Sequence, residues 1–443
     1  MGAPTERVPL SVVARYAPAG FAQGLLPLIV GSWLMYYYSP PEAEGQVLLL
    51  PATIGLIRLL ERIAGAIIEP WFGYLGDRTR SRFGRRRPWM ALGMPALLIA
   101  FVLLWFPPAA TSPDAFSTIL HLALVLMVFH AAYSAVFISY NALLPALAKT
   151  TEDRVRLSMR MATFEVLSNV AGAVGAAPLV GLGAVTMAGI AFSNGFQVLG
   201  MVCGALSLVA LLPVLTVDEP EGSVGQVQTY SFFESLRMSA KNRHFLGYGG
   251  LMLGMRMASM SSIIAVPFVG TQLMGLDEGQ ASLLLAVIII VATLAFPFVE
   301  RLAVRRGKAR VMRWGGVGFI CVLPLIGTVG LIPGVSALVH GTVLFALAGF
   351  SVATLFVLPR ALLADIIDRD ASATGHRREA SYSGMSGVVE KVGEALATGM
   401  VGVLFQFFGN STEVPMGLRL VGVFAAFGVG LGLLAFSRYE DVA

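Results

Sequence analysis

Long apolar segments recur along the chain, and short polar segments separate them. Each apolar segment contains about 20 residues or more, the length that an α-helix needs to cross about 30 Å of hydrocarbon. The pattern therefore predicts an all-α membrane protein with twelve membrane-spanning helices. The predicted spans lie near residues 12–38, 47–74, 88–107, 116–145, 158–186, 194–216, 245–274, 280–302, 311–333, 338–366, 381–408 and 416–437.

The amino-acid composition agrees with this interpretation. Hydrophobic residues make up 56% of the 443 residues and charged residues only 13%, whereas soluble domains carry about 25% charged residues. The mean hydropathy is +0.77. These values argue against the two or three soluble domains that the length alone would suggest. They predict an integral, multi-pass protein of the plasma membrane, which is the inner membrane if the source is bacterial.

Basic residues occur in alternate loops between the predicted spans. The first loop of this series, residues 75–87, contains six arginines, while the loops at 39–46 and 107–114 contain no Lys or Arg. Loops rich in Lys and Arg stay in the cytoplasm, so both termini are predicted to be cytoplasmic. The net charge of +5 therefore orients the chain, and it gives no reason to expect a nucleic-acid partner.

The longest polar stretch, residues 217–243, divides the twelve predicted spans six and six. It predicts an N-terminal six-helix bundle over residues 1–216, a central cytoplasmic loop, and a C-terminal bundle over residues 244–443. A polar loop repeats between the second and third spans of each half, with an acid seven residues before a glycine. Two parallel halves of six helices that carry this loop resemble the major facilitator fold.

The repeated loop also predicts a gate on the cytoplasmic side. An acid near a helix end can pair with basic residues of the neighbouring bundle and hold that side closed. A role in orientation alone is the alternative. The residues expected at the gate are Asp77, Arg78, Arg82, Arg85, Glu300, Asp365, Asp368 and Arg377.

Two long loop sequences resemble the signatures of one transporter group. GYLGDRTRSRFGRRRPW (73–89) and ADIIDRDASATGHRRE (364–379) are similar to those of the glycoside–pentoside–hexuronide:cation symporters, which include the melibiose permease. The runs WLMYYY (33–38) and VVEKVGEA (388–395) agree with this resemblance. It implies a monomer that takes up a small solute through a central cavity by alternating access. H⁺ or Na⁺ would be the coupling ion, with no other cofactor.

Several polar positions of the sugar permeases are absent from this chain. Those permeases carry an acid on helix 1, two acids for the coupling ion on helix 2, and an acid and a tryptophan on helix 4. The corresponding positions here are Gly24, Gly65, Glu69, Phe137 and Asn141. Because three of the four acids are missing, the resemblance does not imply specificity for galactosides.

The stretch LLERIAGAIIEP (59–70) places charged residues inside a predicted span. Each such charge costs about 2.5–3.5 kcal/mol to insert, so it is expected to face a cavity or a partner. On a helix, Arg58, Arg62, Gly65 and Glu69 share one face, with Glu61 at its edge. Glu69 occupies a family ion position and is predicted to carry the coupling ion. The predicted coupling residues are Glu69, Glu61 and Asn141.

Buried polar residues on other spans predict substrate contacts. Lys391 matches the helix-11 lysine of the family directly, and Arg160 matches its helix-5 arginine with a small shift. Both can donate hydrogen bonds to hydroxyl or anionic oxygen. The predicted substrate-binding residues are Gln23, Arg62, Asn141, Arg160, Glu165, Arg256 and Lys391.

Structural roles are open for some of these residues. Arg58 with Glu61, and Lys391 with Glu394, have the i,i+3 spacing of local ion pairs. Arg256 can also be the partner of a helix-11 acid. His130 is interpreted as a packed or interhelical histidine rather than as a proton relay.

The identities of the ion and of the solute follow from the missing acids. A sodium site needs several converging oxygens, whereas a single buried carboxylate suits a proton, so H⁺ is favoured over Na⁺. Without the helix-1 acid and the helix-4 tryptophan, binding of a neutral sugar is weakened. Four cations at membrane depth, Arg58, Arg62, Arg256 and Lys391, instead favour an acidic glycoside or hexuronide.

Two other functions are compatible with the sequence. RMATFEVLSN (160–169) resembles helix 5 of the animal lysophospholipid carriers, which implies a lysolipid or another amphipathic anion as the solute. A sensor or assembly factor that has lost transport is the second alternative. An enzyme is not expected, because the chain shows no metal-spaced His/Cys set, nucleophile elbow or phosphate loop. The expected partners are a small-molecule substrate and the lipid bilayer, without a metal or nucleic acid.

Overall fold

The computed structural model describes most of the chain. The described residues are 8–41, 45–79, 81–109, 112–148, 150–187, 189–219, 241–374, 379–437 and 439. Within these ranges the side chains at 66, 67, 70, 73, 74, 76–78, 151, 152, 155, 379 and 380 are not described.

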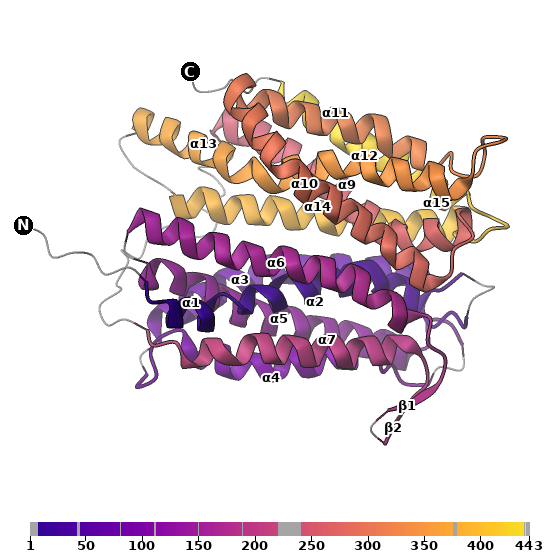
Figure 1. Cartoon of the computed structure of the whole chain (residues 1–443), viewed down its shortest axis with the longest axis horizontal. Helices are drawn as coiled ribbons and strands as arrows, with labels where there is room; N and C mark the ends of the chain where they lie inside the picture. The colour runs from indigo at the N-terminus through magenta and orange to yellow at the C-terminus, as the bar shows by residue number, and fades with distance from the viewer. Residues whose placement is uncertain are drawn as a thin grey trace, which may run out of the picture. The chain divides into compact units, whose positions relative to one another are not determined.

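Long α-helices make up the structure (Figure 1). The first seven are α1 (Leu10–Tyr16), α2 (Ala19–Tyr38), α3 (Pro51–Arg78), α4 (Arg87–Leu103), α5 (Phe116–Leu147), α6 (Thr151–Val180) and α7 (Gly195–Leu211), which continues into the 3₁₀-helix η1 (Leu212–Thr216). The others are α9 (Arg243–Phe268) with the π-helix η2 (Val269–Leu273), α10 (Glu278–Arg306), α11 (Lys308–Ile326), α12 (Ala337–Val357), α13 (Pro359–Thr374), α14 (Glu379–Phe408) and α15 (Met416–Phe436).

Every predicted span contains one of these helices. Among the described residues, nine helical segments are long and apolar enough to cross a membrane, and α4 is apolar but shorter. Helices α3 and α14 occupy two further predicted spans and are more polar. Large apolar side chains such as Leu92 and Leu294 are more than 70% exposed, as expected where lipid surrounds the helices. The total of twelve crossing helices and the cytoplasmic termini stay predictions.

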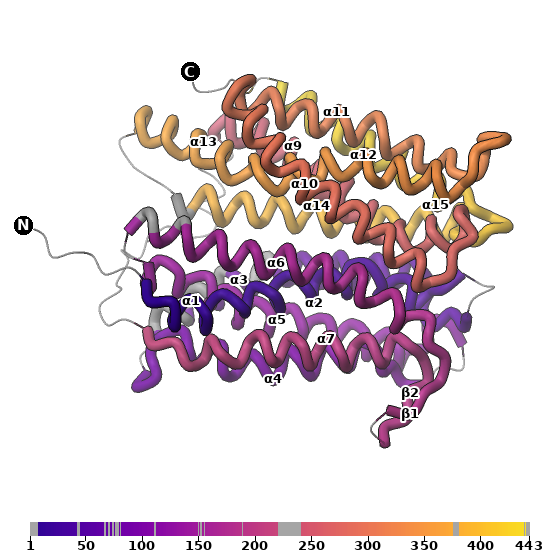
Figure 2. Tube along the Cα trace, viewed as in Figure 1, coloured from indigo at the N-terminus to yellow at the C-terminus, as the bar shows by residue number. Residues whose placement is uncertain are grey.

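A short β-hairpin lies between α6 and α7 in this otherwise helical structure. Strands β1 (Val185–Met187) and β2 (Ile190–Phe192) are antiparallel, and Val185 pairs with Phe192. Gly189 in the turn has a φ of +79°, which glycine adopts without strain. Figure 2 shows the hairpin beyond the ends of α6 and α7. Strands of three residues are too short to produce a recognisable alternating pattern.

The predicted span 338–366 is also divided in the structure. Helix α12 ends at Val357, and α13 begins at Pro359 and extends to Thr374. Proline has no N–H for an intrahelical hydrogen bond, but it fits well at the first position of a helix. Pro359 therefore separates the two helices.

Contacts between residues divide the chain into two compact units. Unit 1 contains residues 1–30, 64–111 and 115–227. Within it, α4 packs on α5 and α7, and α6 packs on α5 and α7. Trp105 is completely buried, and its ring stacks on that of Phe196 with the centroids 6.1 Å apart.

Unit 2 contains residues 31–63, 112–114 and 228–443. Within it, α9 packs on α14 and α15, α10 packs on α12, and α11 packs on α12 and α15. The segment 51–63 of α3 belongs to this unit because it approaches α14 closely. A Cβ atom at Gly402 would stand 2.5 Å from the backbone oxygen of Pro51, and one at Gly55 would stand 3.1 Å from that of Thr398. Small residues allow this approach between helices. The predicted boundary at 217–243 stays a prediction.

Candidate functional site

Glu69 lies against α5 in unit 1. Ser134 Oγ donates a hydrogen bond of 3.3 Å to Glu69 Oε1, and His130 Nε2 is 3.5 Å from the same oxygen. His130 and Ser134 are one helical turn apart, so one face of α5 holds the carboxylate. We call these three residues the Glu69 cluster.

Gly65 makes room for the imidazole of the Glu69 cluster. A Cβ atom at Gly65 would collide with His130 Nε2 and would stand only 2.7 Å from His130 Cδ2. The imidazole therefore fills the space that a side chain at position 65 would need. The interpretation of His130 as a packed or interhelical histidine agrees with this contact between α5 and α3. The glycine one turn before Glu69 was the signal in the sequence for where the imidazole packs.

The other charged residues of α3 form an ion-pair cluster in unit 2. Arg62 Nη1 is 3.0 Å from Glu394 Oε2 of α14, and Arg62 Nε is 3.6 Å from Glu61 Oε2. Arg58 and Glu61 are each only 4% exposed, and Arg58 interacts electrostatically with the other three residues. Glu61, predicted as a ligand of the coupling ion, thus lies beside Arg62. Arg62, predicted to bind substrate, links two helices.

Arg256 of α9 pairs with Glu390 of α14. Their Nη2 and Oε2 atoms are 2.5 Å apart, so the hypothesis that Arg256 is the partner of a helix-11 acid is confirmed. Ser386 Oγ donates a hydrogen bond of 3.4 Å to Glu390 Oε1, and the hydroxyl groups of Tyr248 and Ser386 are 3.0 Å apart. Lys391 follows Glu390 in α14 and is half-buried.

A pocket of about 460 Å³ lies beside this pair within unit 2. Tyr248, Ser383, Ser386 and Glu390 supply polar groups to it, and Arg360 adds a positive charge. The pocket can therefore accept a polar molecule that offers both hydrogen-bond donors and acceptors.

A second carboxylate of unit 1, Glu165, lies against α2. A Cβ atom at Gly24 would stand 3.1 Å from Glu165 Cγ and would collide with Ser168 Oγ. Side chains of α6 thus fill the place where the sugar permeases carry their helix-1 acid. Beside it, the Tyr133 hydroxyl donates a hydrogen bond of 2.8 Å to the backbone oxygen of Gln23.

Two predicted site residues are exposed on their helices. Asn141 lies about two turns beyond Ser134 on α5, so the structure does not place it in the Glu69 cluster. Arg160 of α6 is exposed as well. Phe137, at a helix-4 position that is polar or a tryptophan in the sugar permeases, is buried, and its ring centroid is 4.4 Å from that of Tyr133.

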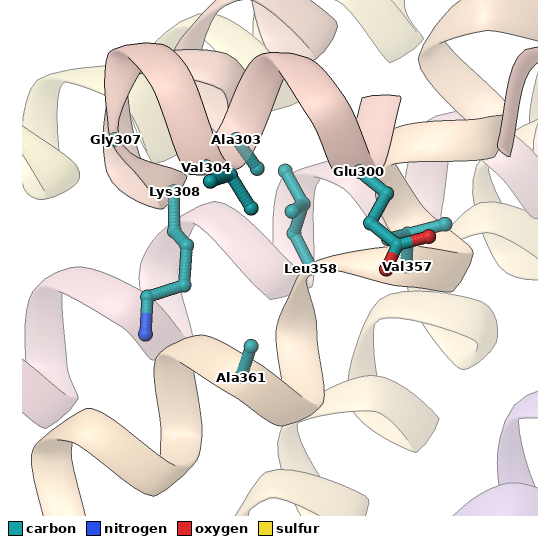
Figure 3. Close-up of a pocket in the computed structure, with 8 residues that line it drawn as sticks. All are labelled: Glu300, Ala303, Val304, Gly307, Lys308, Val357, Leu358 and Ala361. Atoms are coloured by element: carbon teal, nitrogen blue, oxygen red, sulfur yellow. The ribbon is translucent and has the colours of Figure 1, made fainter. Parts of the chain in front are cut away.

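In unit 2, one of the predicted gating residues contacts Lys308. Lys308 Nζ is 2.6 Å from Asp365, so the pair connects the start of α11 with α13. Figure 3 shows Lys308 and Glu300 at opposite ends of a pocket of about 560 Å³ between α10, α12 and α13. Glu300 and Asp368 are exposed.

The corresponding loop of unit 1 is held by two acids that follow η1. Glu219 Oε2 accepts hydrogen bonds from the backbone N–H groups of Arg85 (2.6 Å) and Arg86 (3.0 Å), and Asp218 pairs with Arg87 at 3.1 Å. Arg82 lies over the ring of Phe83. The side chains of Asp77 and Arg78, and all of Arg377, lie outside the described residues.

We expect Asp365→Asn to slow transport by several-fold without reducing the yield of folded protein. The change removes a partly buried ion pair worth up to about 1 kcal/mol, which corresponds to a factor of about five in an equilibrium. Initial rates of solute exchange in proteoliposomes measure the effect. Glu413→Gln is the matched control, because Glu413 is an exposed acid of unit 2 outside the predicted gate. Equal effects of the two changes would show that the Lys308–Asp365 pair has no special role.

No group of three or more His, Cys, Asp or Glu side chains that could hold a metal ion lies in the part of the chain that the structure describes. The charged residues form ion pairs and hydrogen bonds instead, as is usual for ionisable groups within membrane helices.

The sequence matches the family model for MFS/sugar transport proteins over residues 15–431. The chain belongs to this family. It is therefore an integral membrane transporter of the major facilitator superfamily and not an enzyme.

Known relatives cover almost the whole of this MFS transporter. The isoprimeverose transporter of Lactiplantibacillus pentosus is 25% identical and aligns with 98% of this chain and 89% of its own. The sodium-dependent lysophosphatidylcholine symporter 1 of Xenopus tropicalis is 24% identical and aligns with 88% of this chain and 80% of its own. Among solved structures, the nucleoside transporter NupG has a TM-score of 0.66 at 16% identity. It covers 97% of this chain and 100% of its own, and shows a similar fold.

Proposed function

We propose that this MFS transporter is a cation-coupled symporter of a glycoside that carries an anionic group, such as a hexuronide. The observation that carries the proposal is the balance of charges at membrane depth in unit 2. Helices α3, α9 and α14 supply four cations there, Arg58, Arg62, Arg256 and Lys391, against three carboxylates, Glu61, Glu390 and Glu394. An excess positive charge in hydrocarbon is costly, and an anionic substrate would neutralise it.

The glycosidic part of the proposed substrate is supported by unit 1. Glu165 lies where the sugar permeases carry the helix-1 acid that binds sugar hydroxyls, so this carboxylate can accept the same hydrogen bonds. The isoprimeverose transporter named above is a relative whose substrate is a glycoside. The two signature loops support the narrower assignment to the glycoside–pentoside–hexuronide:cation symporters.

Glu69 is the proposed carrier of the coupling ion, and the proposed ion is H⁺. A carboxylate at this depth has to be paired, hydrated or protonated. Substrate and proton would cross together by alternating access, in a monomer. Na⁺ is the alternative ion, since the name of the Xenopus relative includes sodium dependence.

A lysolipid is the second candidate substrate, and the similarity to the lysophosphatidylcholine symporter favours it. Its phosphate would use the same basic side chains, and its acyl chain would need an apolar path. The two candidates differ in a simple way: an acidic glycoside is recognised through hydroxyl groups and carries no acyl chain.

A thermal-shift experiment with the purified protein tests the proposal. We expect 4-nitrophenyl glucuronide to raise the melting temperature more than 4-nitrophenyl glucoside, because ligands that bind only the folded state stabilise it by mass action. Lys391→Ala should lose most of this shift, whereas Lys308→Ala, which removes a cation outside the membrane-depth set, should keep it.

Other outcomes would contradict the proposal in different ways. A shift with lysophosphatidylcholine and none with the glucuronide would support the second candidate. A glucuronide shift that is unchanged in Lys391→Ala would make Lys391 a structural residue. Binding without solute counterflow in proteoliposomes would indicate a sensor rather than a transporter.

A further inference from the structure

Two groups of the Glu69 cluster, the Ser134 hydroxyl and the His130 imidazole, meet at one carboxylate oxygen of Glu69. Ser134 donates to Glu69 Oε1, and His130 Nε2 approaches the same atom within 3.5 Å. His130 is 7% exposed as a side chain, while Glu69 is 31% exposed. The arrangement is a partly exposed carboxylate next to an imidazole that is almost completely buried.

We propose that Glu69 and His130 bind one proton as a pair, and that His130 makes this site selective for H⁺ over Na⁺. The inference rests on the proposed function only in assigning the coupling ion to Glu69. When the pair holds one proton, as an imidazolium with a carboxylate or as an imidazole with a carboxylic acid, its net charge is zero. Release of the proton to water leaves a charge of −1. Loading and unloading therefore move one proton, and no other reactant is needed.

The imidazole makes the same place unsuitable for an alkali cation. Hard cations are bound by several oxygen ligands, whereas imidazole nitrogen suits transition metals. At Gly65 no side chain can add an oxygen, because the imidazole of His130 already fills that space. An imidazolium would in addition repel a second positive charge. Histidine is also the side chain whose ordinary pKa lies within the range of pH that cells use.

Other helices that contact α5 also carry charged groups. Helix α1 carries Arg15, and the hydroxyl group of its Tyr16 donates a hydrogen bond to the backbone oxygen of Tyr140. Helix α4 carries only Arg87, at its first residue. On α6, the charged residues with described side chains are Asp153, Arg154, Arg156, Arg160 and Glu165. Among the described side chains of α3, the titratable group that contacts His130 is the Glu69 carboxylate.

A test that needs no substrate compares the melting temperatures in NaCl and in KCl at equal ionic strength. We expect the parent protein to melt at the same temperature in both salts. The double variant Gly65→Asp/His130→Ala has a second carboxylate and the space for it, and should melt about 2 °C or more higher in NaCl. His130→Ala alone is the control and should not respond to Na⁺. A parent protein that is already stabilised by Na⁺ would overturn the proposal.

A second measurement does not depend on folding of the double variant. His130→Gln keeps a hydrogen-bonding side chain of similar reach but does not titrate. In proteoliposomes with 4-nitrophenyl glucuronide, we expect the pH profile of its exchange to differ from that of the parent by about one pH unit or more. Such a change would be absent if His130 only packs against Glu69. Absence of glucuronide exchange by the parent would contradict the proposed substrate, whereas the salt comparison would still decide the role of His130.

Discussion

Glu69→Gln should abolish concentrative uptake while leaving downhill exchange of the solute in place. The amide has nearly the same size as the carboxylic acid, and it stays neutral at every physiological pH. It therefore imitates the protonated form of Glu69 and cannot release a proton on the cytoplasmic side. Its oxygen can still accept the hydrogen bond from Ser134 Oγ that Glu69 Oε1 accepts at 3.3 Å, so the local packing is expected to persist.

Two assays on the same proteoliposomes separate coupling from exchange. Accumulation driven by an imposed pH gradient should fall to the background level in Glu69→Gln, and counterflow without a gradient should continue. Glu165→Gln is the matched control, because it neutralises another half-buried carboxylate of unit 1. That variant should weaken substrate affinity and keep accumulation dependent on the pH gradient.

The possible contradictions are also distinct. Accumulation at the parent level in Glu69→Gln would mean that Glu69 has a structural role in the contact between α3 and α5. The Glu69→Gln variant could instead be inactive while uptake by the parent follows a sodium gradient and ignores the pH gradient. Glu69 would then be the coupling site, and the coupling ion would be Na⁺ rather than H⁺.

The positions of the helices were predictable because hydrocarbon imposes a simple rule on sequence. An apolar segment of sufficient length satisfies its backbone hydrogen bonds as a helix, and each predicted span contains one. The β1–β2 hairpin and the break at Pro359 were missed, since both depend on a few residues whose effect on local hydropathy is small. Helix α6 also begins earlier than its apolar segment, at Thr151, because its first turns are polar.

Pairing among the buried charges was harder to predict than their presence. The spacing of Arg58 and Glu61, and of Lys391 and Glu394, suggested partners within one helix. Two ion pairs, Arg62 with Glu394 and Arg256 with Glu390, join helices that are far apart in the sequence, and only the second of them was anticipated. A sequence does not show which helices will be neighbours.

His130 illustrates the same limit in the Glu69 cluster. A histidine inside the apolar run of α5 gives no local sign of a partner. Gly65 had been interpreted as an absent acid, and the structure shows that the imidazole occupies its space. The meaning of both residues depends on the contact between α3 and α5.

Neutralising one partner of the Arg62–Glu394 pair should be the most damaging single change in unit 2. Arg62 and Glu394 are 17% and 23% exposed as side chains and 3.0 Å apart. Removing one member of a buried pair costs about 3–5 kcal/mol, because the other charge stays in a medium of low polarity. Glu394→Gln would leave Arg58 and Arg62 with Glu61 as the only carboxylate of the cluster. We therefore expect a large loss of monodisperse protein in detergent and a lower melting temperature.

Two double variants of Arg62 and Glu394 separate the contribution of this pair to stability from its contribution to transport. One exchanges the two charges, and the other replaces both residues with apolar ones. Arg62→Glu/Glu394→Arg should recover much of the yield if attraction between the two side chains is what matters. Arg62→Met/Glu394→Leu removes both charges, and such replacements are often neutral or stabilising. Since residues 51–63 of α3 approach α14 through Gly55 and Gly402, the apolar pair should keep these helices together.

The apolar double variant then decides what the ion pair does during transport. An ion pair can separate and be hydrated when the helices move apart, whereas an apolar contact loses stability when water enters. We expect the double variant to be as stable as the parent and to exchange solute at least about tenfold more slowly, the factor that an added barrier of about 1.4 kcal/mol produces. Parent-level exchange by the stable double variant would mean that Glu394 serves only to compensate the charges of α3. Slow exchange, together with a thermal shift by 4-nitrophenyl glucuronide equal to that of the parent, would mean that the separation of α3 from α14 is a step of the transport cycle.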